Sequence, residues 1–562
     1  MVKEINLLSK KIIDDTYSSS DIVNLILKNR DIKDIDEFLK PSFPKIKLDL
    51  KPALKLINSA IKNNQNILIY GDYDVDGITA TAILWQAIHK IYPNVTPFIP
   101  HREIDGYGIK SKSFFRFQNE KNIKFDLLIT VDNGIVAGME LSKIKEQQDI
   151  KIIVTDHHIA PSRDKACLVP TEIPDIIVAT TELCGSAISY FLSHEIDKNA
   201  DLGLAALGTV ADCLPLVGVN RSIVVHGLKK LSTNPSAGIK TLIDISKINP
   251  KNISTYDLGF ILGPRINAVG RLSDPTDALR LLCSSSLAQA NKYAQVLNNF
   301  NQDRQIIQKE STDIAEAELS RDAIYGVSTD RLIVISGDYN AGIIGLISGR
   351  LTEKYYLPSI VISVDGDIAK GSCRSIPELN IINALRDHSE LFIDLGGHAG
   401  AAGFSILTKN IPKLKKALTK SVNLKLNKIK LVPHLDVDAE MQLNSINIKN
   451  IKSIDSLAPF GIGNPEPIFL FKNITVDSIR TIGQNNDHLK LSVGTDPCVC
   501  SFSAIAFKQG HLINKIKSGD KIDIIASLSL NEWNNTISPQ LIIKEVICLT
   551  PLLYSDALVL LG

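Results

Sequence analysis

The first part of the chain alternates short apolar runs with longer segments whose apolar residues recur at helical spacing. The predicted strands lie at 66–70, 95–99, 127–131 and 152–155. The predicted helices lie at 53–63, 78–88, 139–147 and 202–207. Strands that are apolar on both faces and separated by helices are typical of a mostly parallel sheet. Residues 51–230 are therefore predicted to form one α/β domain.

After this domain the pattern changes three times. Residues 231–325 are predicted to be a helical connector, and their last part, 287–321, carries an apolar stripe without Pro or Gly that predicts one long helix. Residues 326–425 alternate strand and helix again. From 430 to 562, short strands separated by turn signals predict a small β-barrel, best matched by an OB-fold. The fold class predicted is two α/β lobes joined by a long helix around a central groove, followed by this barrel.

The N-terminal segment and the composition add less. Residues 1–50 contain two helix-breaking prolines, Pro41 and Pro44, and are predicted to be a short helical cap on the next domain. The 562 residues are 44% hydrophobic and 22% charged, which indicates a soluble protein of several domains. No apolar run approaches the roughly 20 residues that span a bilayer, and the N-terminus lacks a signal-peptide core, so we expect a cytoplasmic protein.

Charge and cysteines limit the possible sites. The formal net charge of +1 means that any surface that binds nucleic acid must be local. The eight cysteines contain no CxxC pair, so a zinc ribbon or a thioredoxin-type site is not expected, and all eight are interpreted as reduced.

Three carboxylates follow the first predicted strand at alternate positions. They are Asp72, Asp74 and Asp76, and Gly77 then permits the turn into the next helix. An extended backbone would place all three on one side, where like charges repel unless a cation lies among them. Hard oxygen ligands suit Mg²⁺ or Mn²⁺. The alternative is a solvated acidic loop or an Asp that caps the helix.

The other strands of this domain also end in groups that can bind a metal. Asp132 follows 127–131, Asp156, His157 and His158 follow 152–155, and Asp212 follows the helix at 202–207. Ligands gather at the carboxyl ends of parallel strands, so we expect convergence at one edge of the sheet for Asp74, Asp76, Asp132, His157 and Asp212. Two divalent ions held there would suit a phosphoryl displacement, with Asp132 as the shared ligand. Asp156 would orient the imidazoles, and His158 would hydrogen-bond the phosphate or protonate the leaving oxygen.

These motifs carry a family resemblance. Residues 72–77 (DYDVDG), 131–134 (VDNG), 156–158 (DHH) and 208–212 (GTVAD) resemble the four ordered motifs of the DHH phosphoesterase superfamily. Further segments narrow the resemblance to RecJ-type single-strand DNA exonucleases. They are 100–102 (PHR), 106–108 (GYG), 263–268 (GPRINA), 270–272 (GRL), 298–304 (NNFNQDR), 371–375 (GSCRS), 396–400 (GGHAG) and 459–467 (PFGIGNPEP).

The resemblance implies a 5′-to-3′ exonuclease that acts on single-stranded DNA in recombination and repair. It would depend on Mn²⁺ or Mg²⁺, with two ions expected, and would release nucleoside 5′-monophosphates. Related phosphatases place a metal-binding His where this chain has Tyr70, so Asp72 or water would have to replace that ligand. The resemblance also implies a monomer whose partners are a single-strand-binding protein and a helicase. The metal ligands expected are Asp72, Asp74, Asp76, Asp132, His157 and Asp212.

A second group of residues is expected to bind the DNA. Arg265 and Arg271 are predicted to lie in glycine-containing turns. The resemblance assigns Arg271 to phosphate, whereas Arg265 is equally well interpreted as an arginine that ties loops together. We expect the 5′-phosphate and terminal nucleotides to contact Arg102, Arg271, Ser372 and Arg374. His398 is the polar group of a glycine-rich run at 396–403. In the barrel, the candidates for stacking on bases or for basic contacts are Phe502, Phe507, Lys508 and Trp533.

The sequence also leaves two other functions open. A phosphodiesterase for short oligonucleotides or cyclic dinucleotides would be a smaller protein without the barrel. A non-catalytic single-strand DNA-binding scaffold would have lost acidic or His ligands. Here only the position of Tyr70 departs from the expected ligand set.

Overall fold

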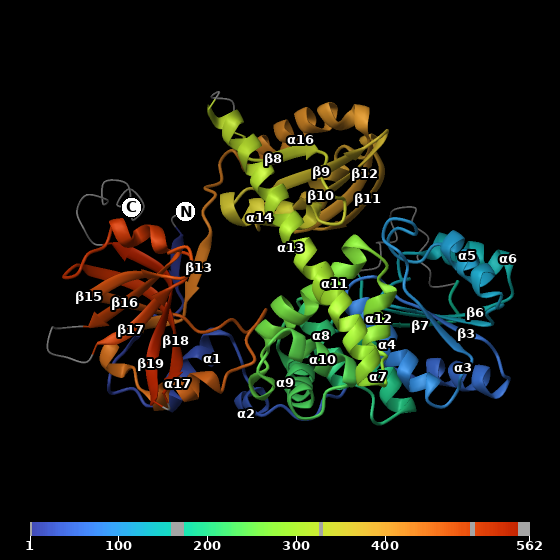
Figure 1. The fold of residues 1–562 in the computed structure, drawn as a ribbon, viewed down its shortest axis with the longest axis horizontal. Coiled ribbons are helices and arrows are strands. Elements are labelled where there is room, and N and C mark those ends of the chain that lie inside the picture. The colour runs from blue at the N-terminus through green and yellow to red at the C-terminus, as the bar shows by residue number, and fades with distance from the viewer. Residues whose placement is uncertain (1–2, 159–172, 325–329, 495–500, 535, 549–562) are drawn as a thin grey trace. The chain divides into compact units, whose positions relative to one another are not determined.

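The chain is divided into two compact units in this computed structural model. The structure describes residues 3–158, 173–324, 330–494, 501–534 and 536–548 (Figure 1). The first unit comprises 43–214 and 222–433. The second comprises the described residues of 2–42, 215–221 and 434–562. The second unit is therefore assembled from three separate stretches of the chain.

The first unit begins with a parallel five-stranded sheet, and all the strands predicted in it are confirmed. Its strands are β3 (Ile67–Tyr70), β4 (Val95–Phe98), β5 (Leu127–Val131), β6 (Lys151–Asp156) and β7 (Ile176–Ala179), in the order β4-β3-β5-β6-β7. The helices of this lobe are α3 (Lys51–Lys62), α4 (Val75–His89), α5 (Ser111–Lys121), α6 (Gly138–Gln147), α7 (Gly185–Ile196), α8 (Leu202–Ala211) and α9 (Gly218–Thr233). Helices α5 and α6 cover one face through an apolar cluster with β3, β5 and β6.

The strand order places a topological switch point in the middle of this sheet. From β3 the chain moves outward to β4 on one side, and then returns to place β5 on the other side of β3. Ligands of such sheets bind beyond the carboxyl ends of the two strands that flank the switch. Here those strands are β3 and β5, which are followed by Asp72 and Asp132.

The connector is helical, as predicted. It contains α10 (Ala237–Ile245), α11 (Gly263–Leu272), α12 (Thr276–Leu282) and α13 (Leu287–Ile324). The 38 residues of α13 give it a length of about 57 Å. Its first part packs on α10, α11 and α12, and Ala315 near its other end is buried in the core of the second lobe (Figure 1).

The turns expected around Arg265 and Arg271 are not present, because both residues lie inside α11. The neighbouring glycines serve close packing instead. A Cβ on Gly263 would lie 2.9 Å from the Leu258 carbonyl oxygen, and one on Gly270 would lie 2.8 Å from that of Tyr73. A glycine that permits close approach of backbone looks the same in a sequence as one that permits a turn.

The second lobe of the first unit is a mixed five-stranded sheet. Its strands are β8 (Ile333–Gly337), β9 (Ser359–Asp365), β10 (Ile368–Arg374), β11 (Phe392–His398) and β12 (Ala401–Leu407), in the order β11-β12-β10-β9-β8. Only β8 and β9 pair in parallel. Helices α14 (Ile344–Tyr355), α15 (Ile381–Arg386) and α16 (Ile411–Leu426) accompany it. Ser372 and Arg374 lie at the end of β10.

The second unit contains the predicted barrel. Five strands, β15 (Phe469–Ile482), β16 (His488–Gly494), β17 (Phe502–Ala506), β18 (Lys521–Trp533) and β19 (Thr536–Cys548), are ordered β16-β17-β19-β18-β15. The additional pairing of β15 with β16 closes the barrel. Before it come β13 (His434–Val437), β14 (Ala439–Met441) and α17 (Ile448–Asp455).

The N-terminal segment differs from the expected helical cap on the following domain. It contains β1 (Glu4–Leu7), β2 (Ile12–Ile13), α1 (Ser19–Asn29) and α2 (Ile35–Leu39). Strand β1 pairs in parallel with β13, β2 pairs with β14, and Ile22 and Ile26 of α1 are buried in the core of the barrel. These partners lie more than 400 residues away in the sequence, so no local pattern reveals them.

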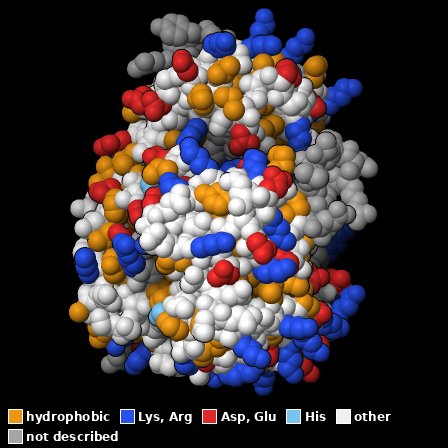
Figure 2. Space-filling model, turned by 90° about the vertical axis from the view of Figure 1, so that its right-hand side faces the viewer, with side chains coloured by type: hydrophobic (Ala, Val, Ile, Leu, Met, Phe, Trp, Pro, Cys, Tyr) orange, Lys and Arg blue, Asp and Glu red, His pale blue; other side chains and the backbone are white. Residues whose placement is uncertain are grey.

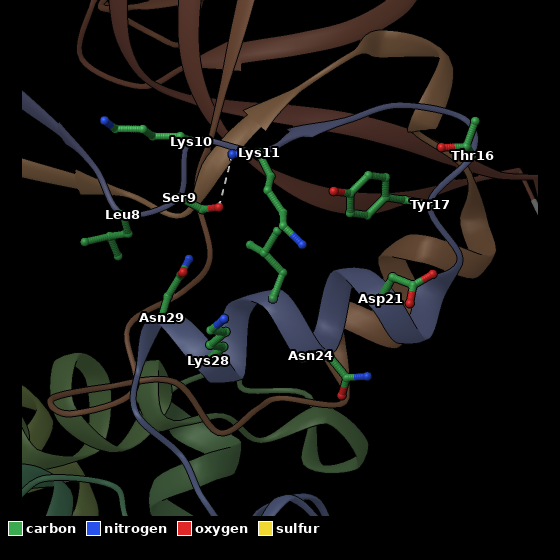
Figure 3. Close-up of a pocket in the computed structure, with 11 residues that line it drawn as sticks. Leu8, Ser9, Lys10, Lys11, Thr16, Tyr17, Asp21, Asn24, Lys28 and Asn29 are labelled. Carbon is green, nitrogen blue, oxygen red and sulfur yellow. Dashed lines mark hydrogen bonds between the residues drawn. The ribbon is translucent and has the colours of Figure 1, made fainter.

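A pocket of about 770 Å³ lies between residues 8–17 and helix α1 (Figure 3). Lys11 extends toward α1, whereas Lys10 points away from it. The pocket is thus a polar hollow in the second unit, separate from the strand ends of the first.

The charge distribution on the surface and the state of the described cysteines agree with the low net charge and the reduced thiols expected from the sequence. On the face shown in Figure 2, positive and negative side chains are interspersed over most of the surface. Among the described helices, none is long and apolar enough to cross a membrane. Cys184, Cys213, Cys283 and Cys373 are free thiols, and the side chains of the other cysteines lie outside the described part of the chain.

We expect Ile26→Ala to lower the free energy of unfolding of the second unit by about 2–5 kcal/mol, because it leaves a cavity in the barrel core. Urea unfolding would be followed by the fluorescence of Trp533 in a Trp85→Phe background. The control is Ile35→Ala, an Ile in the same segment that is 36% exposed. Equal stability of both variants would contradict the assignment of residues 2–42 to the barrel core.

Candidate metal centre and phosphate-binding cluster

The acidic turn after β3 is built around the start of α4. Asp74 is the N-cap of this helix, and its Oδ1 accepts a hydrogen bond of 3.0 Å from the Gly77 amide. A Cβ on Gly77 would lie 2.6 Å from the Asp72 backbone, so this position requires glycine. The backbone does not stay extended through Asp76, so the condition under which all three carboxylates would lie on one side is not met. Because α4 begins at Val75, Asp76 lies in the first turn of the helix, whereas Asp72 and Asp74 precede the helix.

Asp76 is held by the amino end of α7. Its Oδ2 accepts from the Gly185 amide at 2.6 Å, and its Oδ1 accepts from the Ser186 amide at 2.8 Å. Amides at a helix N-terminus stabilise a carboxylate as the anion. The helices also make room for the acids, since a Cβ on Gly185 would lie 2.5 Å from Asp132 Cβ, and one on Gly208 would lie 2.6 Å from Asp76 Oδ1.

His157 lies at the centre of the acids that follow the other elements. Its Nε2 is 3.0 Å from Asp132 Oδ1, 3.6 Å from Asp212 Oδ2 and 3.8 Å from Asp76 Oδ2. Asp132 directly follows β5, and Asp212 caps the carboxyl end of α8. Groups that are up to 136 residues apart in the chain, from Asp76 to Asp212, therefore meet at one edge of the sheet, as expected.

The donor set fits divalent cations such as Mn²⁺ or Mg²⁺. Within the described residues, Asp72 Oδ1 and Asp132 Oδ1 are buried without a hydrogen-bond partner. The 3.0 Å contact of Asp132 Oδ1 with His157 Nε2 therefore does not have the geometry of a hydrogen bond. Three groups have ligand atoms within 4.8 Å of one another: Asp72, Asp74 and Asp132; Asp76, His157 and Asp212; and Asp132, His157 and His158. Carboxylate oxygen with imidazole nitrogen suits these ions.

Electrostatics lead to the same conclusion. Burial, followed by the charge of Asp74, raises the pKa of Asp72 to about 8. Burial, followed by the charge of Asp76, likewise raises the pKa of Asp212 to about 8. Burial lowers the pKa of His157, which favours the neutral ring that can bind a metal. A cation among these acids would relieve the repulsion that raises their pKa values.

Asp156 orients His158. Its Oδ1 lies 2.7 Å from His158 Nδ1 and accepts from the backbone amides of His157 and His158, and its Oδ2 accepts from the Ile135 amide. Although burial opposes it, the hydrogen bond and charge of Asp156 raise the pKa of His158 to about 9. The other ring nitrogen, Nε2, is 2.9 Å from the Tyr107 hydroxyl. His158 is therefore fixed on both sides, and its contact with Tyr107 was not predicted.

Tyr70, which occupies the position of the superfamily's metal-binding His, is a core residue. It is fully buried in the cluster between the sheet and α5, and its ring contacts Phe98 with centroids 5.0 Å apart. Asp72 instead takes part in the group with Asp74 and Asp132.

A cluster of arginines lies beside the acids. Arg271 donates to the Gly342 carbonyl at 3.1 Å, just before α14. A Cβ on Gly345 would lie 3.0 Å from Ser372 Oγ and 3.3 Å from Arg374 Nη2, which places both groups at the amino end of that helix. Burial, and then the charges of Arg102, Arg304 and Arg374, lower the pKa of Arg271 to about 10. Cations gathered at a helix N-terminus form an anion site.

The other residues that were predicted to contact DNA are Arg265, His398 and Trp533. Arg265 donates to the Ile261 carbonyl at 2.8 Å and to Asn298 Oδ1 at 3.2 Å, which favours the interpretation that it ties elements together. His398 is exposed at the end of β11, and its described hydrogen bond is accepted from the Gly400 amide. The backbone of Trp533 ends β18, but its side chain lies outside the described residues.

Two further residues of the site were not assigned a role from the sequence. Asn267 Oδ1 accepts from the Val75 amide at 3.0 Å and so supports the start of α4. Arg304 donates to Asn301 and Gln308, while its buried Nε has no partner among the described residues. Asn267 and Arg304 lie in segments 263–268 and 298–304, which carry the family resemblance. The resemblance could therefore have drawn attention to both residues, but it does not indicate which groups they contact.

Comparison with known protein families agrees with this architecture. Residues 66–211 match the N-terminal domain of the DHH family, and residues 329–424 match the DHHA1 domain. Residues 437–545 match the RecJ OB domain. The matched segments coincide with the parallel sheet, the mixed sheet and the barrel.

Individual relatives extend the similarity over nearly the whole chain. The single-stranded-DNA-specific exonuclease RecJ of Bacillus subtilis (strain 168) is 31% identical over 546 residues, which cover 96% of this chain and 67% of that protein. RecJ of Haemophilus influenzae is 29% identical over 569 residues, which cover 95% of this chain and 97% of the relative.

Solved structures agree with the sequence comparison. The crystal structure of RecJ in complex with Mn²⁺ from Thermus thermophilus has the same fold, with a TM-score of 0.80 and 24% identity over 97% of this chain and 79% of that one. Another crystal structure, of exonuclease RecJ bound to manganese, is 28% identical with a TM-score of 0.57, and covers 69% of this chain and 98% of that one. The chain therefore belongs to the RecJ family of single-stranded-DNA-specific exonucleases.

Proposed function

We propose that this exonuclease digests single-stranded DNA from the 5′ end, depends on two divalent cations, and releases nucleoside 5′-monophosphates in DNA recombination and repair. The observation that carries the proposal is the adjacency of an acidic cluster and an arginine cluster in one unit. The charge of Arg102 acts on Asp72, and the charge of Asp74 acts on Arg271. One cluster suits cations and the other suits phosphate.

The cations would be held by the acids at the strand ends. The proposed ligands are Asp72, Asp74, Asp76, Asp132, His157 and Asp212. Asp132 and His157 each belong to two of the three groups whose atoms lie within 4.8 Å. Asp132 would be the shared ligand, because a carboxylate has two oxygens that can bind two ions, whereas one imidazole nitrogen binds one. When bound, Mn²⁺ or Mg²⁺ would stabilise the charge that develops on the phosphodiester and favour ionisation of the attacking water.

The chain's own groups orient the substrate. Asp156 holds His158 through Nδ1 and polarises the ring. Nε2, which contacts the Tyr107 hydroxyl here, would exchange that partner for a phosphate oxygen or for the leaving oxygen that it protonates. Asp156 is a positioning residue because it contacts His158 and backbone amides rather than the cluster of acids.

The arginine cluster would set the direction of digestion. Arg102, Arg271, Ser372 and Arg374 would bind the terminal 5′-phosphate at the amino end of α14. A terminal phosphate carries more negative charge than an internal one, so a site made of cations selects a phosphorylated end. Arg304, whose charge also acts on Arg271, would contribute to the same field.

The barrel would retain the single strand. Phe507 is 52% exposed and packs edge-on against His488, and Lys508 follows it. An exposed aromatic ring beside a cation is a sequence-independent platform for a base. By family resemblance, the protein would act in the cytoplasm as a monomer with a single-strand-binding protein and a helicase as partners.

We expect Asp132→Ala to lower hydrolysis of end-labelled single strands at least about a thousandfold, because it removes the shared ligand. Binding of the same strand in the presence of chelator should persist. The assay compares single strands, double strands and RNA, with Mn²⁺, with Mg²⁺ and with chelator. Unchanged turnover, or digestion that continues in chelator, would exclude the proposed centre.

Thermal unfolding tests the metal site without an activity assay. In chelator, Asp132→Asn should unfold at a higher temperature than the wild type, because it removes one of several repelling buried charges. Mn²⁺ should stabilise the wild type by about 2.7 kcal/mol at a hundredfold excess over its Kd, and the variant much less. Asp367→Asn, a change at an exposed Asp, is the control. An equal Mn²⁺ shift in both variants would contradict the ligand assignment.

Arg374→Ala should reduce the preference for 5′-phosphorylated over 5′-hydroxyl strands by about 10–100-fold, as expected for a charge-assisted hydrogen bond worth about 1.5–3 kcal/mol. Competition between the two strands measures the preference. The matched control is Arg386→Ala, at an exposed arginine of α15. If the preference survives in Arg374→Ala, the 5′-phosphate is bound elsewhere.

A further inference from the structure

Two neighbouring aromatic rings lie exposed on the surface of the first unit, which carries the proposed metal centre. Phe260 is 72% exposed, the highest value for a large apolar side chain among the described residues, and Tyr256 is 63% exposed. Their ring centroids are 5.1 Å apart and the ring planes differ by 23°, so the rings are stacked on each other. Scattered exposed apolar side chains are ordinary, whereas adjacent ones indicate a surface that binds a ligand.

The rings project from a segment whose other side is fixed in the core. Residues Asp257–Leu262 form a π-helical turn directly before α11, and Leu258 and Leu262 are fully buried. Because residues four positions apart lie on the same side of a helix, Tyr256 and Phe260 share its solvent side. The pair is therefore held in place before a ligand binds, which lowers the entropic cost of binding. Such turns are frequent at functional sites.

This segment packs beside the elements that carry metal ligands. A Cβ on Gly259 would lie 3.4 Å from Val210 Cγ1, in the last turn of α8, which Asp212 caps. A Cβ on Gly263, which follows the segment, would lie 3.8 Å from Val75 Cγ2 at the start of α4. The aromatic pair thus belongs to the same lobe as the acids and adjoins two of the helices around them.

A row of arginines leads from the aromatic pair to the proposed phosphate site. Arg265 donates through Nη1 to the carbonyl of Ile261, the residue after Phe260, at 2.8 Å. Burial, followed by the charge of Arg265, lowers the pKa of Arg304. Arg304 is in turn one of the cations around the buried Arg271. These three positive charges therefore follow one another from the Phe260 backbone to the arginine cluster.

The combination of stacked rings and a row of cations favours a single-stranded nucleic acid as the ligand. Cations follow the phosphates of a strand, and aromatic rings stack on bases whatever their identity. Asp257, the acid of the segment, is occupied locally, since its Oδ2 accepts from the amide and the hydroxyl of Ser254, both at 2.8 Å. A protein that covered the rings with apolar side chains would have no use for the arginines.

We infer that Tyr256 and Phe260 form a stacking platform for a base of the single strand, within the catalytic unit itself. Arg265 and Arg304 would bind the phosphates between this platform and the 5′-phosphate. The inference rests on the proposed function in one respect, which is the assignment of the arginine cluster to that terminal phosphate. The catalytic unit would then hold a strand at two points, independently of the aromatic ring proposed on the barrel.

Substitutions at Phe260 separate stacking from apolar packing. Phe260→Leu keeps an apolar side chain without a π face, whereas Phe260→Tyr keeps the ring. With chelator present to prevent hydrolysis, Phe260→Leu should weaken binding of a labelled single strand about tenfold, and Phe260→Tyr less than about twofold. Fluorescence anisotropy of the strand measures both. The control is Leu424→Ala, at a side chain of α16 that is 70% exposed, and it should match the wild type.

A strand of the same length without bases, built from tetrahydrofuran abasic nucleotides, tests whether the ring acts on a base. The wild type should bind this strand more weakly than the normal one. In Phe260→Leu the ratio of the two affinities should be about tenfold smaller, because the stacking that the abasic strand lacks is already lost.

The outcomes separate the hypotheses. If folded Phe260→Leu binds the normal strand as tightly as the wild type, or loses the same factor on both strands, the ring does not stack on a base and the inference fails. If the wild type shows no preference for 5′-phosphorylated strands, the proposed phosphate site fails, while a base-dependent loss in Phe260→Leu would still support the platform. Should Phe260→Leu not fold, Tyr256→Leu must show the base-dependent loss, and its absence would overturn the inference.

Discussion

Repulsion among buried carboxylates is the constraint on which the catalytic unit depends. Asp72, Asp76 and Asp132 are each only 2% exposed, at the switch point of a parallel sheet. Such a group of acids persists only where local donors and added positive charge offset its cost. The fold supplies the donors through the amino ends of α4 and α7, and it supplies space through glycines at the contacts of α4, α7 and α8. The elements around the site are therefore arranged for ionised oxygen rather than for apolar packing.

The arginines are the complement of this arrangement. Burial and the neighbouring arginines disfavour the positive charge of Arg271. In the same way, burial and the neighbouring Asp74 disfavour the negative charge of Asp72. Each cluster is unfavourable alone, and a substrate that brings phosphate to one and is bridged by cations to the other relieves both. Strain that remains in the free protein and is released on binding is the expected signature of a site organised for its ligand.

The parts of the fold predicted from sequence are those whose physics is local or follows the rules of parallel sheets. The ends of β3, β5 and β6 indicated where Asp72, Asp132 and His157 would meet, because strand ends in such sheets share an edge. Prediction failed beside Arg271, because a glycine that permits close packing of a helix cannot be told from one that permits a turn. It also failed for β1 and β13, because the two paired strands are far apart in the sequence. The buried hydrogen bonds of Arg221 could not be predicted for the same reason, since its carbonyl partners, Phe38 and Ala458, come from opposite ends of the chain.

The pairing of β1 with β13 and of β2 with β14 has a consequence for biosynthesis. Both strands are synthesised before the catalytic unit, yet their partners follow more than 400 residues later. The nascent chain must therefore carry two unpaired strand edges and the apolar face of α1 while the whole catalytic unit is made and folds. The core of the second unit can therefore be completed only after the nuclease lobes have been synthesised.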